Sequence, residues 1–211
     1  YITLQTAVPS TTGSTANTMV DRLKLSNGVM VGKAFDMNYG VIPVEQFFAL
    51  NADLAGSNVN TAQNLFGVGV TLAANTIYAF EMVFTLYKTA GATSHAISIG
   101  FNIGSGTINA VNYSILGQFT GNPTTTLNAP DYMQYIQTAS ATAVTGATTT
   151  AGVNYQSVIK GLISIGTSGK WTPQYTLSAA PGGAYSTLAG SYVRIYPVGA
   201  SGANVNTGGW S

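Results

Sequence analysis

The chain has 211 residues, of which seven are Lys or Arg and six are Asp or Glu, with one His and no Cys. Charged residues make up 6% of the sequence, against about 25% in an ordinary soluble domain. A net charge of +1 excludes an electrostatic footprint for nucleic acid or for an anionic membrane. The lack of Cys excludes disulfides and thiolate metal sites. This composition favours an all-β structural or binding protein over an enzyme.

The hydrophobic fraction is 45% and the mean hydropathy is +0.23. A chain of this length can bury one good core, so we expect one main domain. No stretch approaches the ~18 apolar residues of a membrane span, and residues 1–20 lack the pattern of a signal peptide. Because the sequence begins at Tyr1, we expect either processing or, as the favoured interpretation, a longer parent protein.

Residues 1–20 combine a short extended run with a Pro/Ser/Thr/Gly cluster, which predicts a strand or arm followed by a linker. Arg22–Val31 holds two alternating runs joined by Asn27-Gly28, the strongest short hairpin signal, because a type I′ turn needs positive φ at both central residues. We therefore predict an arm, linker and stalk hairpin over residues 1–40, and a head domain over 41–211.

The first part of the predicted head mixes clear and ambiguous segments. Ile42–Leu50 is apolar and aromatic and is assigned as a strand, although its spacing also fits a short helix. Asn60–Phe66 predicts one helical turn with Asn60 as N-cap and Gly67 at its end. Thr76–Lys88 alternates strictly between apolar and other residues, so we predict the central strand of the core there.

The rest of the chain predicts a series of strands separated by Gly, Asn, Pro and Thr clusters. This spacing without a long helix indicates a two-layer antiparallel β-sandwich, with a jelly roll as the favoured version. The Thr/Ala-rich tract 138–152 has no aromatic anchor and predicts an exposed edge or a surface loop. The predicted strands are His95–Ile103, Ala110–Phe119, Tyr132–Thr138, Asn154–Ile165, Lys170–Ala179 and Leu188–Val198.

Edge strands in this sequence have little protection against pairing with other chains. Lys88, Lys160, Lys170 and Arg194 are the cations available in the strand region to discourage it. We therefore expect the edges to be buried in a closed homo-oligomer, most plausibly a homotrimer.

Few residues of this sequence could take part in catalysis or bind a metal ion. His95 has no acidic or second His neighbour in sequence and is interpreted as a surface or hydrogen-bonded structural residue. Glu81 lies in mid-strand opposite the aromatic face and calls for a partner such as Arg194 or Lys160. Asp131 follows Pro130 and fits a turn. We expect no catalytic, cofactor-binding or metal-binding residues.

The aromatic residues offer the only candidates for ligand contact. Trp171, Tyr175 and Trp210 could stack on sugar rings if they are exposed. Core or interface packing is the favoured role of Trp171, and Trp210, in a Gly-rich tail, could also clasp a neighbouring subunit.

Several segments resemble structural proteins of tailed phages, many of them aquatic and cyanophage-like. The shared patterns are a P-x-E-Q strand, an A-Q-x-L-F turn, an A-N-T-x-Y-x-F-E core strand and a W-T-P-Q segment near the end. The start of the chain is similar to the shaft-side repeats of phage fibres. The segments that carry the resemblance are 1–4, 23–31, 40–53, 61–66, 72–81, 171–174 and 190–199.

The resemblance implies a structural protein on the virion surface, assembled in the host cytoplasm, with a trimeric β-sandwich head on a thin stalk. We therefore expect a fibre or tip protein that binds host glycan through several weak sites. The alternative is a capsid decoration or cement protein, or a head fibre, whose N-terminal arm contacts other virion proteins. A cellular surface or matrix module comes third, and an enzyme such as a depolymerase last.

Overall fold

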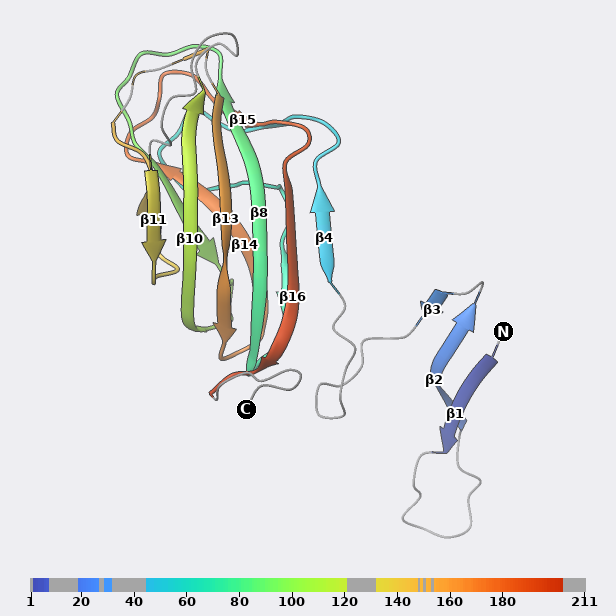
Figure 1. The fold of residues 1–211 in the computed structure, drawn as a ribbon. Coiled ribbons are helices and arrows are strands. Elements are labelled where there is room, and N and C mark those ends of the chain that lie inside the picture. Colours follow the sequence, from blue (N-terminus) through green and yellow to red (C-terminus); the bar gives the residue numbers. More distant parts are fainter. Residues whose placement is uncertain are drawn as a thin grey trace. The chain divides into compact units, whose positions relative to one another are not determined.

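The computed structural model describes residues 2–7, 19–26, 29–31, 45–120, 132–147, 149, 151–152 and 154–202. The chain divides into two compact units, Tyr1–Pro43 and Val44–Ser211. Every regular element among the described residues is a strand, which confirms the all-β prediction (Figure 1). No helix in this part of the chain is long and apolar enough to span a membrane.

The N-terminal unit is a three-stranded antiparallel sheet of β1 (Ile2–Ala7), β2 (Met19–Ser26) and β3 (Val29–Val31). β2 and β3 pair with Ser26 opposite Val29, as expected for a hairpin closed by Asn27-Gly28. The two turn residues themselves lie outside the described residues.

The larger unit is an antiparallel sandwich of two sheets. Its strands on the first sheet are β4 (Gln46–Ala49), β5 (Leu54–Ala55), β8 (Thr76–Lys88), β10 (Ile108–Thr120), β11 (Tyr132–Ile136), β13 (Asn154–Ile165), β15 (Tyr185–Thr187) and β16 (Tyr192–Ala200). The second sheet consists of β6 (Gln63–Asn64), β7 (Val70–Leu72), β9 (Ile97–Asn102), β12 (Thr142–Ala143) and β14 (Gly169–Leu177).

The order of the strands is that of a jelly roll. The first sheet runs β4-β16-β8-β13, and in the second sheet β14 lies between β9 and the short strands β6 and β7, with β12 beyond β9. In chain order the strands alternate between the sheets as two Greek keys do. The hairpin β10–β11 widens the first sheet beyond β13. The predicted jelly-roll-like sandwich is therefore confirmed.

Alternation along β8 builds the core. Thirteen residues from Thr76 to Lys88 alternate between buried and half-buried positions, as the sequence predicted. The inward side chains meet aromatic residues of the second sheet. The Phe80 ring centroid lies 5.3 Å from that of Phe101 and 5.5 Å from that of Trp171. Edge-to-face and tilted packing of this kind adds to the free energy gained by burial.

The predicted helical turn at Asn60–Phe66 is wrong. Gln63 and Asn64 form β6, which pairs with Tyr175 and Gln174 of β14. Leu65 donates its backbone N–H to the Pro173 carbonyl at 3.0 Å and is wholly buried. Burial of Leu65 and its neighbour Phe66 in the core outweighs the local helix signal, because short segments have little intrinsic helical stability.

Two other segments differ in extent from the prediction. The strand expected at Ile42–Leu50 is β4, Gln46–Ala49, while residues 42–44 lie outside the described residues. In the tract 138–152, Thr142–Ala143 forms the edge strand β12 beside β9. Val144 is completely buried and Ala139 also packs against the core, so this tract is anchored to the sandwich.

The four cations named as available to discourage edge pairing lie on strands with neighbours on both sides, so they give the edges of the sandwich no protection. Lys160 lies in β13 and Arg194 in β16, both of which have strand neighbours on two sides. Lys170 lies in β14, between β7 and β9, and Lys88 is buried. None of the described edge strands of the sandwich carries Lys or Arg; they are β4, β5, β6, β7, β11 and β12.

Candidate functional site

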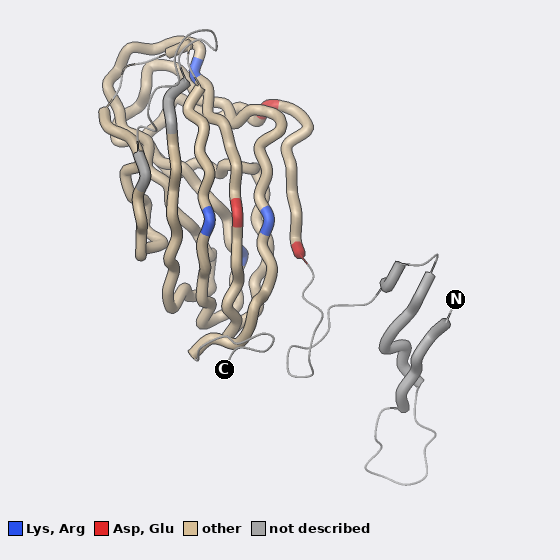
Figure 2. The backbone as a smooth tube through the Cα atoms, in the orientation of Figure 1, with Lys and Arg blue, Asp and Glu red and all other residues tan. Residues whose placement is uncertain are grey.

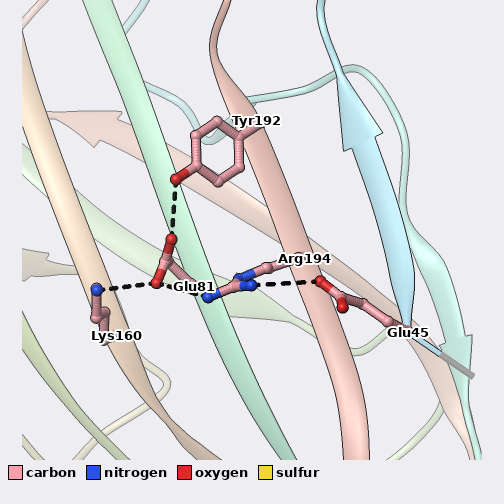
Figure 3. Close-up of polar contacts among 5 residues, drawn as sticks. All are labelled: Glu45, Glu81, Lys160, Tyr192 and Arg194. Carbon is pink, nitrogen blue, oxygen red and sulfur yellow. Dashed lines mark hydrogen bonds and ion pairs between the residues drawn. The ribbon is translucent and has the colours of Figure 1, made fainter. Parts of the chain in front are cut away.

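The main polar cluster lies in the middle of the outward face of the first sheet (Figure 3). Sheet register places Glu81 of β8 directly between Lys160 of β13 and Arg194 of β16. The Glu81 carboxylate accepts from Tyr192 Oη at 2.8 Å and pairs with Lys160 Nζ at 2.9 Å and Arg194 Nη2 at 3.2 Å. The predicted ion pair of Glu81 is therefore confirmed, with both proposed partners at once.

These contacts hold Glu81 in its ionised form. Hydrogen bonds from Lys160, then Tyr192, and the Arg194 guanidinium lower the pKa of the Glu81 carboxyl to about 2, against the opposing effect of burial. The same contact with Glu81 raises the pKa of Tyr192. Arg194 is also 3.7 Å from Glu45, so two carboxylates and two cations balance. A carboxyl group with so low a pKa is a poor general acid or base near neutral pH, and we assign this cluster a structural role.

A second polar cluster is buried inside the sandwich. His95 is 1% exposed, its Nδ1 is 2.8 Å from the Thr93 carbonyl oxygen and its Nε2 is 2.8 Å from Tyr185 Oη. Because a carbonyl oxygen only accepts, Nδ1 carries the proton and Nε2 accepts from Tyr185. Burial lowers the pKa of His95, and so does the nearby Lys88 charge. The interpretation of His95 as a hydrogen-bonded structural residue is confirmed.

Sequence reasoning missed the third member of this cluster. Lys88 is 1% exposed, and its Nζ donates to the carbonyl oxygens of Gly91 at 3.2 Å and Pro181 at 3.4 Å. Its Nζ also lies 5.7 Å from the centroid of the Tyr185 ring. Burial lowers the pKa of Lys88 and raises that of Tyr185 to about 12. The sequence pattern could have predicted this burial, because Lys88 lies on the same face of β8 as the alternating core residues.

The predicted glycan contacts of Trp171 and Tyr175 need correction. Trp171 is 1% exposed and Tyr175 is 2% exposed, because both alternate inward along β14. Neither ring has a face free to stack on a sugar, and the favoured core role of Trp171 is the one observed. Trp210 lies outside the described residues, as does Asp131, for which a turn was predicted.

Two hollows mark the surface of the sandwich. One, of about 340 Å³, lies over β9 and β14, and most of its lining is Ala, Gly and other apolar residues. Its polar side chains are those of Asn102, Ser140, Gln174 and Thr176. The other, of about 400 Å³, is an uncharged and mostly apolar groove between β4 and β7. Its lining includes Phe48, Val70, Trp171, Val193 and Ile195. In the described part of the chain, no group of three acidic, His or Cys side chains is placed to hold a metal ion.

Comparison with known proteins gives no family. No family model matches the chain, and no curated protein matches it. A chain in the solved structure of infectious bursal disease virus, Gx strain, aligns over 92% of this chain and 44% of its own length, with 10% sequence identity and a TM-score of 0.21. This chain thus spans less than half of that one, and a TM-score of this size carries no argument about fold or function.

Proposed function

We propose that this chain is a structural protein of a tailed-phage virion, a homotrimeric fibre or tip protein that attaches the particle to host-surface glycan. The observation that supports it best is a jelly-roll sandwich in a chain of which only 6% of the residues are charged. Jelly rolls are common in viral capsid and lectin domains. Low charge suits adhesion, because binding then depends little on the salt of the surrounding water.

The hollow over β9 and β14 is our proposed glycan contact. Its amide groups at Asn102 and Gln174 and its hydroxyl at Thr176 match the donors and acceptors of sugar hydroxyls. Gln174 Nε2 already donates to Asn64 Oδ1 at 3.0 Å, which fixes the orientation of its amide. A shallow site of this kind binds weakly, and three copies on one trimer would supply the missing affinity through avidity. Trp210 stays a second candidate contact.

The alternative is a capsid decoration or cement protein. The observation in its favour is that edge strands β4 and β12 carry no charged residue, which suits pairing with strands of shell subunits. Its N-terminal residues would then contact other virion proteins.

Localisation on the particle separates these roles. An antibody raised against the purified chain should label the tail tip or baseplate in electron micrographs of the phage if the chain is a fibre protein. Labelling over the head would contradict attachment and favour decoration, and no labelling of any particle would contradict both.

Glycan binding is tested on a surface of immobilised host polysaccharide. We expect the purified chain to be retained, and the double variant Asn102→Ala and Gln174→Ala to lose retention at least tenfold. Thr71→Ala, an exposed change on β7 outside this hollow, serves as the matched control. Equal retention of both variants would contradict the assignment of this hollow.

A further inference from the structure

We infer that the outer face of the first sheet is the surface through which this chain contacts a second copy of itself. By outer face we mean the side chains of β11, β10, β13, β8, β16 and β4 that point away from the second sheet. This inference rests on the proposed homotrimer, and names the interface that would hold it together.

Exposed apolar side chains gather on this face. Five large hydrophobic residues are exposed among those described, and four of them lie here: Phe47 at 62%, Tyr135 at 64%, Leu162 at 48% and Leu116 at 45%. Register places Leu116 beside Val158 on the neighbouring strand, and Leu162 beside Ala79 of β8. On the other side of Ala79 lies Tyr196 of β16. Apolar side chains therefore lie on both sides of the charged row that contains Glu81. Clustered exposure of this kind marks interaction sites.

The area of the face matches what a stable contact needs. The six strands together hold 56 residues. At about 3.3 Å per residue and about 4.8 Å between strands, they give a face on the order of 900 Å². A standard protein interface buries about 800 Å² on each partner. One further copy covering this face would therefore bury enough surface for specific association.

The charges of the face favour a partner as poor in charge as this chain. Register places Lys160, Glu81 and Arg194 side by side on β13, β8 and β16. Figure 2 shows a row of basic, acidic and basic positions across the middle of the sheet. Glu81 pairs with both cations, and Arg194 also contacts Glu45, so the row is internally neutral. Burying ion pairs in an interface costs less free energy of desolvation than burying unpaired charged side chains. A second copy, with 6% charged residues, can cover the row without opposing it with like charges.

In a ring of three copies, the outer face of each would contact a different surface of the next copy. Such a head-to-tail contact closes when the rotation is one third of a turn. It also keeps Glu81 of one copy away from Glu81 of the next, which a twofold contact centred on this row would not do.

Light scattering coupled to size exclusion tests the interface in the purified chain of 211 residues. We expect the mass of three 21.7 kDa protomers for the wild type, and of one protomer for the double variant Leu116→Glu and Leu162→Glu. Val68→Glu is the matched control, because Val68 is the fifth exposed hydrophobic residue, at 40%, and lines the groove between β4 and β7 instead. This control should keep the mass of the wild type.

A wild-type mass of one protomer at about 100 µM, or a double variant that assembles like the wild type, would overturn the inference. Circular dichroism and the melting temperature show whether the variants fold. Labelling provides a second measurement, because the natural chain has no Cys. Ser114→Cys on this face should react with maleimide at least tenfold more slowly than Asn102→Cys on the other sheet, and equal rates would contradict the interface. The mass does not depend on where the chain sits on a particle, so failure of the virion assignment is recognised separately.

Discussion

Replacement of Glu81 by Gln tests whether the charged row stabilises the sheet. The variant keeps the shape of the side chain and removes the charge that Lys160, Tyr192 and Arg194 contact. A fall in the pKa from 4.5 to about 2 corresponds to a ceiling of about 3 kcal/mol at about 1.36 kcal/mol per pKa unit. Because the cluster lies at the surface, solvent screens it, and we expect a loss of about 1–2 kcal/mol at pH 7.

The pH dependence gives the sharper test. The folded-state pKa of Glu81 lies below its value in the unfolded chain, so its contribution to stability is complete above about pH 4.5 and is lost as the pH falls toward 2. The difference in unfolding free energy between wild type and Glu81→Gln should therefore be full at pH 7 and close to zero at pH 2. Urea denaturation followed by Trp fluorescence measures it at both pH values.

Glu45→Gln is the control for this experiment. Glu45 is 3.7 Å from Arg194, and its side chain is 45% exposed, so its loss should cost less than about 0.5 kcal/mol. The reasoning is refuted if Glu81→Gln is as stable as wild type at pH 7, or if their difference persists unchanged at pH 2. Equal losses of unfolding free energy for Glu81→Gln and Glu45→Gln would also refute it, because the central position of Glu81 between two cations would then add no stability.

Three further predictions concern a buried histidine, the aromatic core and the register of the first sheet. Burial lowers the pKa of His95 in the folded state, so the stability of the wild type should fall as the pH drops below about 6.5. In urea titrations between pH 7 and 5, His95→Asn should show no such fall. If the stabilities of the two proteins change with pH in parallel, His95 is not a buried neutral residue. Phe80→Ala should lower the free energy of unfolding by about 3–5 kcal/mol in the same assay, because the Phe80 ring is 3% exposed and packs on Trp171. A loss under about 1 kcal/mol would contradict the core packing observed here. Gly161→Val should unfold the sandwich or lower its melting temperature by at least about 5 °C, because a Cβ at this position would overlap the Asn112 carbonyl oxygen of β10. An unchanged melting temperature would contradict the observed register between β10 and β13.

The sequence predicted most of the strands of the head domain, and the reason is local. A strand with one buried face must alternate with a period of two, and this pattern is visible in the residues of β8 and β13 without knowledge of their neighbours. The one predicted helical element failed at Asn60–Phe66, where contacts with β14 some 110 residues later decide the backbone conformation.

Alternation alone determined which residues share a face of a strand, including the parity that places Lys88 with the core residues of β8. Only the tertiary structure decided which face is covered, so Trp171 and Tyr175 pack inside the sandwich although their sequence would equally suit an exposed aromatic site. Likewise, the sequence by itself identified Glu81 as a charge in need of a partner and offered two. Both pair with it because β8 lies between β13 and β16, an adjacency set by the packing of the whole sheet and carried by no local pattern.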